Sequence, residues 1–364
     1  MKILLSGFCL LSFLSLSAQD SLTILFAGDA MMHQKQLDNT RRGDFFDLGS
    51  YFANIEREVK AVDIAVVNFE VPLGGEPYSG YPVFSAPEDF ALALQKAGFD
   101  FFLLANNHCL DRRTRGFVRT IQALDSLGIR HTGTFLDCDH RHRTYPMLLR
   151  KKDFRIIMLN YTYGTNGLKV DIPRIVNYID KEIMKGDIAE AKLFNPDFII
   201  ANMHWGLEYE RIPSREQREQ RELADWLMRQ GVDLVIGSHP HVVQPMELRR
   251  GKEGVPDRLV VYSLGNFISN MGREHTDGGV MVKVVLGRKG LRRYIVSAQY
   301  SLIYSSRYKN EQGKEDIRVV PAASWSGKNQ NSSFSVDSAL IKYVNNTRLF
   351  LKGNNKEVEE YIFE

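Results

Sequence analysis

The chain has 364 residues, 44% of them hydrophobic and 25% charged, with a formal net charge of +3 at pH 7. This is the balance of an ordinary globular protein, long enough for one large core or for one core with a small appended lobe. The low net charge argues against nucleic-acid binding driven by bulk charge. The basic clusters RHR (141–143) and RKKDFR (150–155) are interpreted as solvated faces, with attraction of an anionic substrate as the alternative.

The N-terminal segment MKILLSGFCLLSFLSLSAQD has the pattern of a secretory signal peptide. A lysine precedes a continuous apolar run that ends in small residues and is too short for a membrane span. We place cleavage after Ala18, so residues 1–18 form the signal peptide. The mature protein is then exported, periplasmic or extracellular, with no transmembrane segment. The remaining Cys109 and Cys138 could form one disulfide, which the sequence alone does not decide. Two cysteines are too few for a disulfide scaffold or a cysteine zinc site.

Six segments share one form, an apolar run that ends abruptly in polar residues. They are LTILFAGDAMMH, DIAVVNFEVP, DFFLLANNHCLD, DFIIANMHWG, DLVIGSHPHVV and RLVVYSLGNFIS. Runs that are apolar at every position predict strands buried on both faces. Between several of them lie helix-like segments, APEDFALALQKAGF, RGFVRTIQALDSLGI and SREQREQRELADWLMRQGV, the last with Ser214 as N-cap and Gly231 at its end. This alternation indicates an α/β domain with a largely parallel central sheet.

The pattern changes after about Gly279. The segments VMVKVVL, RYIVSAQYSLIY and IRVVPA predict antiparallel strands, and SVDSALIKYVNNTRLFLKGN predicts a late helix. We therefore expect a main domain over residues 19–285 and a C-terminal β-rich extension over 286–364 that packs on the same domain.

Polar side chains gather where the predicted strands end. Ligands of α/β sheets bind beyond the carboxyl ends of the strands. Those ends carry Asp29, Asn68, Glu70, Asn106, Asn107, His108, His204, His239, His241 and Asn266. A single such residue would mean little, but six strands that deliver polar or metal-capable residues to one rim predict a binding site.

The histidine pair in GSHPHVV is the clearest candidate for metal ligation. Pro240 biases His239 toward extended conformations, and in an extended chain residues two apart point to the same face. His239 and His241 would then grip one metal or two adjacent metals. Taken alone, the fragment fits a pair of loop histidines bonded to backbone equally well.

The other strand ends carry similar alternatives. Asn107 offers an oxygen ligand and His108 can protonate a leaving group, although Asn and Asp also favour turns. Taken alone, His204 would be interpreted as a core residue whose ring nitrogens are hydrogen-bonded. Asp29 alone would be interpreted as a turn residue or a helix cap. Glu70 follows a buried run directly, where an unpaired charge is costly, so a cation partner is expected. No G-x-S-x-G, Walker or G-x-G-x-x-G signature is present.

Together these residues suit one or two divalent ions of the Mn, Fe or Zn class. Their motifs, in order, resemble the CapA-type bacterial capsule synthesis (poly-γ-glutamate) proteins, whose fold is similar to that of calcineurin-like metallophosphoesterases. The resemblance rests on FAGDAMM, VVNFEVPLGG, ANNHCLDRRTRGFVRTIQALDSLGIRHTG, ANMHWGLEY, GSHPHVVQPME and YSLGNFI, over roughly residues 22–280. It implies a layered metallophosphatase-like sandwich of central, mostly parallel sheets flanked by helices, with antiparallel C-terminal strands.

The resemblance also implies roles for individual residues. Asp29 would be the first-metal carboxylate, Glu70 the bridging carboxylate and Asn107 the amide ligand of the second metal. His204 and His239 would complete the second metal, His241 would bind the first, and His108 would be the general acid.

Two departures stand out. The family's D-x-H appears as Asp29-Ala30-Met31, so a ligand of the first metal is missing although His33 lies nearby, and Glu70 replaces the usual bridging aspartate. The first site would therefore bind weakly, prefer another metal or stay empty.

On the substrate side we expect Asn68, Asn106, Asn266 and Arg112. Arg112, Arg113 and Arg115 could hold carboxylates or phosphates, with a solvated helix face as the alternative for at least two of them. The expected function is metal-dependent hydrolysis of a phosphoester, or of an amide in an anionic polymer, in capsule or poly-γ-glutamate metabolism at the cell envelope. Partners would be that polymer and membrane proteins of capsule synthesis, with no nucleic acid. The alternative is a non-catalytic envelope protein that binds and guides the polymer for export.

Overall fold

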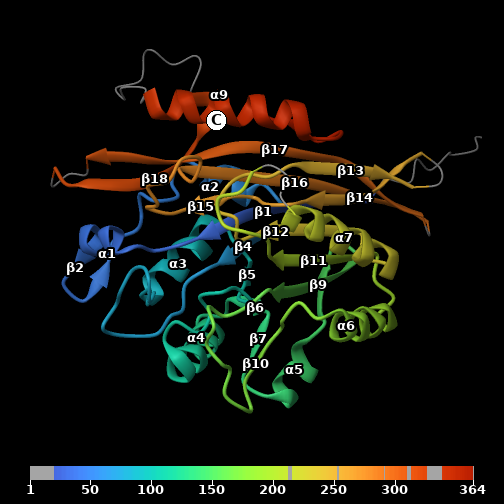
Figure 1. Cartoon of the computed structure of the whole chain (residues 1–364), viewed down its shortest axis with the longest axis horizontal. Helices are drawn as coiled ribbons and strands as arrows, with labels where there is room; N and C mark the ends of the chain where they lie inside the picture. The colour runs from blue at the N-terminus through green and yellow to red at the C-terminus, as the bar shows by residue number, and fades with distance from the viewer. Residues whose placement is uncertain are drawn as a thin grey trace, which may run out of the picture.

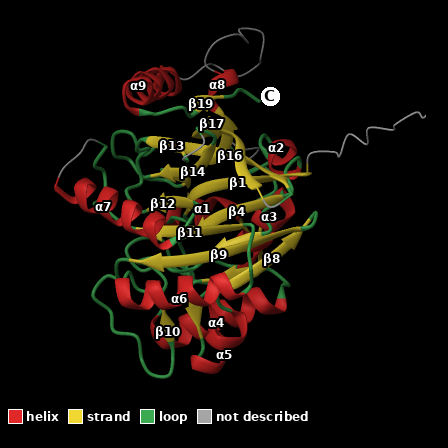
Figure 2. Ribbon diagram, turned by 90° about the vertical axis from the view of Figure 1, so that its right-hand side faces the viewer, coloured by secondary structure: helices red, strands yellow, loops and turns green. Residues whose placement is uncertain are grey.

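The computed structural model describes residues 20–211, 215–251, 254–290, 292–309, 313–325 and 338–363. The predicted signal peptide and the predicted N-cap Ser214 lie outside these ranges. Two β-sheets pack face to face, and helices cover their outer faces (Figures 1 and 2). The predicted α/β sandwich with mostly parallel central sheets is thus confirmed. Within the described ranges, no helix has the length and apolar character needed to cross a membrane.

The first sheet has a parallel half and an antiparallel half. Its strand order is β18-β17-β16-β1-β4-β5-β6, with β15 beside β1 and β19 beside β17. The parallel strands are β1 (Asp20–Ala30), β4 (Ile64–Phe69), β5 (Phe101–Leu103), β6 (Arg130–Thr132) and β15 (Asn266–Ile268). The predicted antiparallel C-terminal strands are β16 (Gly278–Lys289), β17 (Arg292–Lys309) and β18 (Glu315–Pro321), followed by the short β19 (Glu359–Glu360). The expected domain boundary at residue 285 falls inside β16, which pairs with β1.

The second sheet has the order β13-β14-β12-β11-β9-β8. Its parallel centre is formed by β9 (Phe154–Thr162), β11 (Phe198–His204), β12 (Leu234–Ser238) and β14 (Pro256–Val261). The edge strands β8 (Met147–Lys151) and β13 (Met246–Arg250) run antiparallel to it. Two small pairs, β2 (Arg41–Arg42) with β3 (Phe45–Phe46) and β7 (Thr134–Phe135) with β10 (Ile175–Val176), lie outside both sheets.

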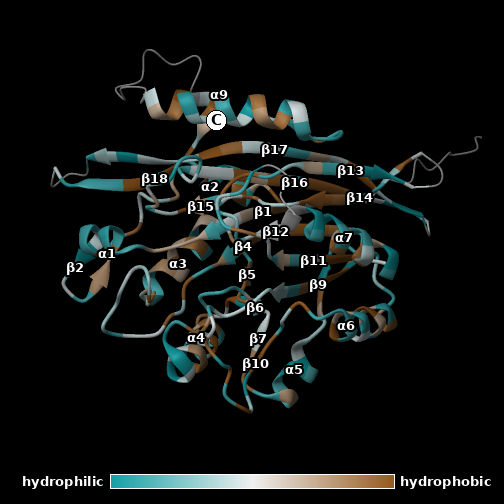
Figure 3. Cartoon of the chain, in the orientation of Figure 1, coloured by the Kyte–Doolittle hydropathy of each residue, from teal (hydrophilic) through white to brown (hydrophobic). Residues whose placement is uncertain are grey.

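The apolar runs are buried on both faces because alternate residues enter different cores. Ile24 lies in the core between the two sheets, whereas its neighbour Leu25 packs under the helices of the first sheet. In the second sheet Ile236 faces the same inter-sheet core, and Val235 packs under the opposite helical layer. Figure 3 shows long apolar stretches on the central strands and mixed polar and apolar residues on the helices.

The helices form two outer layers, and one further helix lies near the C-terminus. On the first sheet lie α1 (Gln34–Thr40), α2 (Glu56–Lys60), α3 (Glu88–Ala97) and α4 (Arg113–Ser126); α5 (Cys138–Thr144), α6 (Lys181–Leu193) and α7 (Arg215–Gln230) follow along the chain. The three helices predicted before residue 232 are α3, α4 and α7, and Gly98, with φ of 111°, caps the carboxyl end of α3. After the short α8 (Ala322–Trp325), the predicted late helix α9 (Ser338–Asn354) runs along β17 (Figure 1). Cys109 is buried, Cys138 is exposed, and both are free thiols.

The carboxyl ends of the parallel strands from both sheets meet at one edge. Asp29 lies at the end of β1, His204 ends β11, and Glu70 directly follows β4. Two glycines permit the close approach there, since a Cβ on Gly28 or Gly237 would lie 1.9 Å from a backbone oxygen of a neighbouring segment. One expectation is corrected. Asn266, expected at the carboxyl end of a strand, instead begins β15 beside Asp29 in the first sheet, because the chain leaves β14 and crosses between the sheets.

Candidate metal centre

His239 and His241 lie in a tight turn after β12, and their ring centroids are 5.9 Å apart. The predicted extended geometry is wrong, because φ is 98° at His239 and 59° at His241. The steric restriction before Pro240 disfavours the right-handed helical region without forcing extension. Contacts with other segments hold the turn instead: the His239 amide donates to Asp29 Oδ2 at 3.3 Å, and the Tyr209 amide donates to the Pro240 carbonyl at 2.8 Å.

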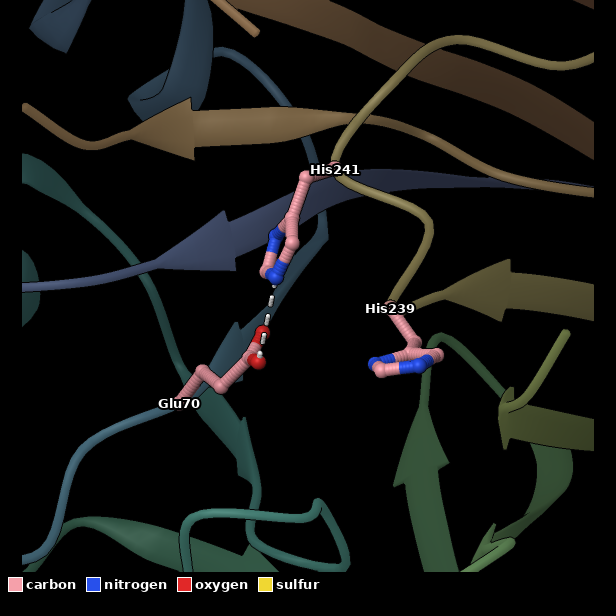
Figure 4. A group of neighbouring side chains, drawn as sticks. All are labelled: Glu70, His239 and His241. Atoms are coloured by element: carbon pink, nitrogen blue, oxygen red, sulfur yellow. Dashed lines mark ion pairs between the residues drawn. The ribbon is translucent and has the colours of Figure 1, made fainter. Parts of the chain in front are cut away.

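Glu70 is the centre of the cluster. It joins His239 and His241 in one group, and Asp29 and His204 in another, and within each group the possible ligand atoms lie within 4.8 Å of one another. Its Oε1 is 3.7 Å from His204 Nε2 and 3.9 Å from His241 Nε2. Figure 4 shows the His241 ring pointing at the Glu70 carboxylate, with the His239 ring beside it. All of these side chains are buried.

Asp29 and Glu70 are bridged by Asn68. The Asn68 amide nitrogen donates to Asp29 Oδ1 at 2.7 Å and to Glu70 Oε2 at 3.1 Å. Asn68 is 1% exposed, as buried as the two carboxylates, and its hydrogen bonds fix their orientation. Asn68 was predicted to contact substrate, but we interpret it instead as a residue that positions the two carboxylates.

Asn266 orients His241 in a similar way. Its Oδ1 lies 3.0 Å from His241 Nδ1, and its amide nitrogen donates to the Thr276 carbonyl at 2.9 Å and to Ser269 Oγ at 3.0 Å. Because the amide nitrogen is committed to acceptors, the oxygen must face the ring, and Nδ1 must carry the proton. His241 Nε2, directed toward Glu70, is then the nitrogen free to bind a metal.

His204 is held by the predicted amide ligand Asn107. The distance between His204 Nε2 and Asn107 Oδ1 is 2.9 Å, and the His204 and His239 ring centroids are 4.7 Å apart. The predicted residues Asp29, Glu70, Asn107, His204, His239 and His241 are therefore all brought together at one edge.

The charges of this cluster fit a cation. Burial and the neighbouring Asp29 carboxylate raise the pKa of Glu70 well above its usual value. Burial and nearby imidazoles lower the pKa of His204, and lower that of His239 to about 3, so both rings are neutral ligands at neutral pH. Burial opposes ionisation of both Asp29 and His241, yet their hydrogen bond lowers the pKa of Asp29 and raises that of His241.

Two buried atoms in the cluster, Glu70 Oε1 and His239 Nδ1, lack hydrogen-bond partners within the described part of the chain. Buried polar atoms are rarely left without partners, since each costs about 1–3 kcal/mol. A divalent ion would satisfy both atoms at once. Carboxylate and imidazole donors suit the Mn, Fe or Zn class.

His108 lies beside this group and is paired with Asp111 of the same NNHCLD motif, a pairing that the sequence did not predict. Its Nδ1 lies 2.8 Å from Asp111 Oδ2, and the same oxygen accepts the Phe84 amide at 2.9 Å. Asp111 thus fixes the ring and leaves Nε2 as the nitrogen that can exchange a proton with substrate. The i, i+3 spacing of His108 and Asp111 in NNHCLD was a usable signal.

Two residues predicted to bind substrate instead form hydrogen bonds with other groups of the protein. Asn106 donates to the Phe69 carbonyl at 2.9 Å and accepts the His108 amide at 3.1 Å, so it braces the chain before Glu70. Arg112 donates to the Pro77 carbonyl at 2.7 Å. Arg113 and Arg115 are exposed, as the solvated alternative predicts.

Neither Met31 nor His33 supplies the missing first-metal ligand. Met31 is buried in the core under the helices of the first sheet. His33 Nδ1 accepts the Asn270 amide at 3.1 Å, and burial lowers the pKa of His33 to about 4. With that lone pair engaged, the neutral ring carries its proton on Nε2 and is a poor ligand.

Tyr163, absent from the sequence predictions, borders the site. It follows β9 and is 47% exposed, and its ring centroid is 4.5 Å from that of His239. Burial of its hydroxyl, together with Glu208 and Glu70, raises the pKa of Tyr163 to about 12. The run FRIIMLNYT has the same form as the other six and could have revealed it.

The profile of the family described as "Bacterial capsule synthesis protein PGA_cap" matches residues 23–271. The capsule biosynthesis protein CapA of Bacillus anthracis is 28% identical over 287 residues, covering 74% of this chain but only 65% of that protein. The chain therefore spans less than two thirds of that relative's length. The PGA biosynthesis protein CapA of Bacillus subtilis (strain 168) is 27% identical, over 77% of this chain and 72% of that protein. The crystal structure of the calcineurin-like phosphoesterase YfkN from Bacillus subtilis is similar at 15% identity and a TM-score of 0.47, over 91% of this chain and 97% of that chain.

Proposed function

The chain belongs to the bacterial capsule synthesis protein PGA_cap family, and from that premise we propose that it is an exported metal-dependent hydrolase of the cell envelope. Its substrate is an anionic polymer of the poly-γ-glutamate kind, or a phosphoester. The observation that carries the proposal is the buried Glu70 Oε1, which has no hydrogen-bond partner and faces His204 and His241. Export rests on the signal-peptide pattern of residues 1–18.

The ion would be held by Glu70, His239 and His241, with His204, Asn107 and Asp29 next to them. A divalent ion of the Mn, Fe or Zn class supplies Lewis acidity and activates water at neutral pH. Asn68 and Asn266 keep the carboxylates and the His241 ring in place. Preorganised ligands of this kind lose little entropy on binding.

Proton transfer is assigned to His108. Asp111 accepts from His108 Nδ1, so protonated His108 presents Nε2–H to a leaving group and Asp111 stabilises the charged ring. His108 is 4% exposed, and Phe84 packs edge-on against it with ring centroids 4.8 Å apart. The ring is therefore fixed and largely shielded from water, as a proton donor to a weak leaving group requires.

Turnover measurements on metal-loaded protein test this proposal. The substrates are a generic phosphodiester and a γ-glutamyl amide oligomer. We expect metal-dependent turnover of one of them, and a loss of about 100-fold or more in His108→Ala with unchanged metal content. The matched control is His131→Ala, which removes a buried histidine paired with Asp125 away from the site. Metal-loaded wild type that turns over neither substrate would overturn the hydrolase proposal.

One observation favours a second candidate function. Because Met31 takes the place of a first-metal ligand and points into the core, the centre lacks part of a two-metal hydrolytic site. A non-catalytic envelope protein that binds and guides the polymer for export would tolerate that loss. Binding of the polymer without turnover of either substrate is its expected signature.

A further inference from the structure

Two β-hairpins with basic side chains lie side by side at the end of the sandwich opposite the metal centre. One joins β8 to β9 and carries Arg150, Lys151 and Arg155; the other joins β16 to β17. Arg288 links them, because its Nη1 donates to the Asp153 carbonyl at 3.0 Å and its guanidinium lies 5.2 Å from the Phe154 ring centroid. We define the basic hairpin surface by Arg150, Lys151, Arg155, Arg288, Lys289, Arg292 and Arg293, of which Arg155 and Arg288 are half-buried and the others exposed.

The strand register places like charges directly opposite one another. Cations that face each other across an antiparallel pair destabilise it. The pairs here are Arg150 with Arg155, Arg288 with Arg293, and Lys289 with Arg292. The Arg150–Arg155 pair costs stability that a bound anion would restore.

The protein neutralises only part of this charge. Asp197 lies 3.5 Å from Arg288, and Arg293 donates to the Pro196 and Asp197 carbonyls. In the described part of the chain, the side chains of Arg150, Lys151 and Arg155 have no carboxylate within ion-pair distance. Lys152 pairs with Asp63 at 2.7 Å, and the turn also carries the exposed Asp153, so the three cations Arg150, Lys151 and Arg155 leave the β8–β9 hairpin with a surplus of positive charge.

We propose that the basic hairpin surface binds the anionic polymer as a polycarboxylate chain. The proposal rests on the proposed function for the nature of that polymer. The surface contains an open groove of about 440 Å³, lined by residues 150–155 and Arg288. An open groove with charges spread over two hairpins suits several weak carboxylate contacts along a chain better than one small anion. Its one apolar lining residue, Phe154, is buried, so the groove offers no apolar anchor for a lipid surface.

The basic hairpin surface would hold the polymer at a distance from the metal centre. β9 leads from this surface at Phe154 to the metal centre beside Thr162. At roughly 3.3 Å per residue, those eight steps span about 26 Å. A short substrate cannot reach both places, whereas a polymer can.

The test compares binding of poly-γ-glutamate, at low salt, to full-length wild type and to R150E/K151E. We expect the variant to bind about tenfold more weakly and with a smaller dependence on salt. The matched control K96E/K185E changes the net charge equally at exposed helical positions and should bind like wild type. R150E also places opposite charges across the strand pair, so the unfolding temperature should not fall.

Equal binding by R150E/K151E and wild type, or no polymer binding by wild type, would overturn the proposal. Binding of wild type to anionic phosphatidylglycerol vesicles but not to poly-γ-glutamate would overturn it in favour of a lipid surface. Metal-dependent turnover of the small phosphodiester should be unchanged in R150E/K151E. Loss of polymer binding in R150E/K151E without any turnover in wild type would therefore leave this surface standing and remove only the hydrolase proposal. Should the double variant fail to fold, R155Q carries the same test.

Discussion

Replacing Glu70 with glutamine tests the metal centre most selectively. Glu70→Gln keeps the size of the side chain and an oxygen that can accept the Asn68 hydrogen bond now made to Glu70 Oε2 at 3.1 Å. It removes the carboxylate that belongs to both candidate ligand groups. It also removes one of two buried carboxylates that lie side by side. We therefore expect metal-free Glu70→Gln to be at least as stable as metal-free wild type, while its response to metal is lost.

The magnitude follows from linkage between binding and unfolding. An ion present at 100 times its dissociation constant stabilises wild type by about 2.7 kcal/mol. Changes in the outer shell alone weaken metal affinity by 10–100-fold, so loss of a ligand should weaken it by about 100-fold or more. Glu70→Gln would then gain only about 0.4 kcal/mol at the same ion concentration. At about 2 °C per kcal/mol, the two proteins differ by about 4–5 °C in their metal-induced shift.

The assay is thermal unfolding of each protein with and without Mn²⁺, Zn²⁺ or Fe²⁺. The control is Glu247→Gln, at a buried carboxylate that pairs with Arg249 away from the site. This control should lose stability but keep the metal-induced rise. A full metal-induced rise in Glu70→Gln would refute the reasoning, as would a metal-free protein much less stable than wild type.

Three further predictions rest on single contacts. Asp111→Asn should lower turnover and leave metal content intact, because Asp111 contacts His108 and the Phe84 amide rather than a predicted metal ligand; parallel kinetics and elemental analysis check this, and loss of metal would contradict it. Asn266→Ala should weaken metal affinity by about 10–100-fold by freeing the His241 ring, measured by competition with a chelator; unchanged affinity would remove its positioning role. Burial raises the pKa of Asp233 from 3.8 to about 6, so the folded state binds more protons than the unfolded state between these values. The contribution of Asp233 to stability should fall by about 3 kcal/mol as pH rises through that window, and Asp233→Asn should remove that contribution from the difference in stability between pH 4 and pH 7 in urea unfolding.

The sequence predicted most of the fold because the central strands are apolar at every position. Ile24 and Leu25 enter different cores, and only a strand between two packed layers requires both. The same form of run was missed at β9 (Phe154–Thr162), and Tyr163 was missed with it. The crossing of the chain to β15 could not be predicted either, because strand pairing depends on which segments meet in space.

The sequence predicted which residues form the site better than it predicted their geometry. Glu70 and the histidines lie together because parallel strands of both sheets end at one edge. The positive φ of His239 arises from contacts with Asp29 and Tyr209 that local sequence does not encode. Asn68 and Asn106, expected to meet substrate, are turned inward by hydrogen bonds to Asp29 and to the Phe69 carbonyl. Such partners lie more than 30 residues away in sequence, beyond the reach of motif spacing.

The central claim is that this cluster binds a divalent transition metal. Elemental analysis after equilibrium dialysis against Mn²⁺, Fe²⁺ and Zn²⁺ tests it most directly, with wild type and His239→Ala treated side by side. The account predicts at least one equivalent of one of these ions per wild-type chain and a marked loss in His239→Ala. Wild type that retains no metal, or His239→Ala that retains as much as wild type, would contradict it.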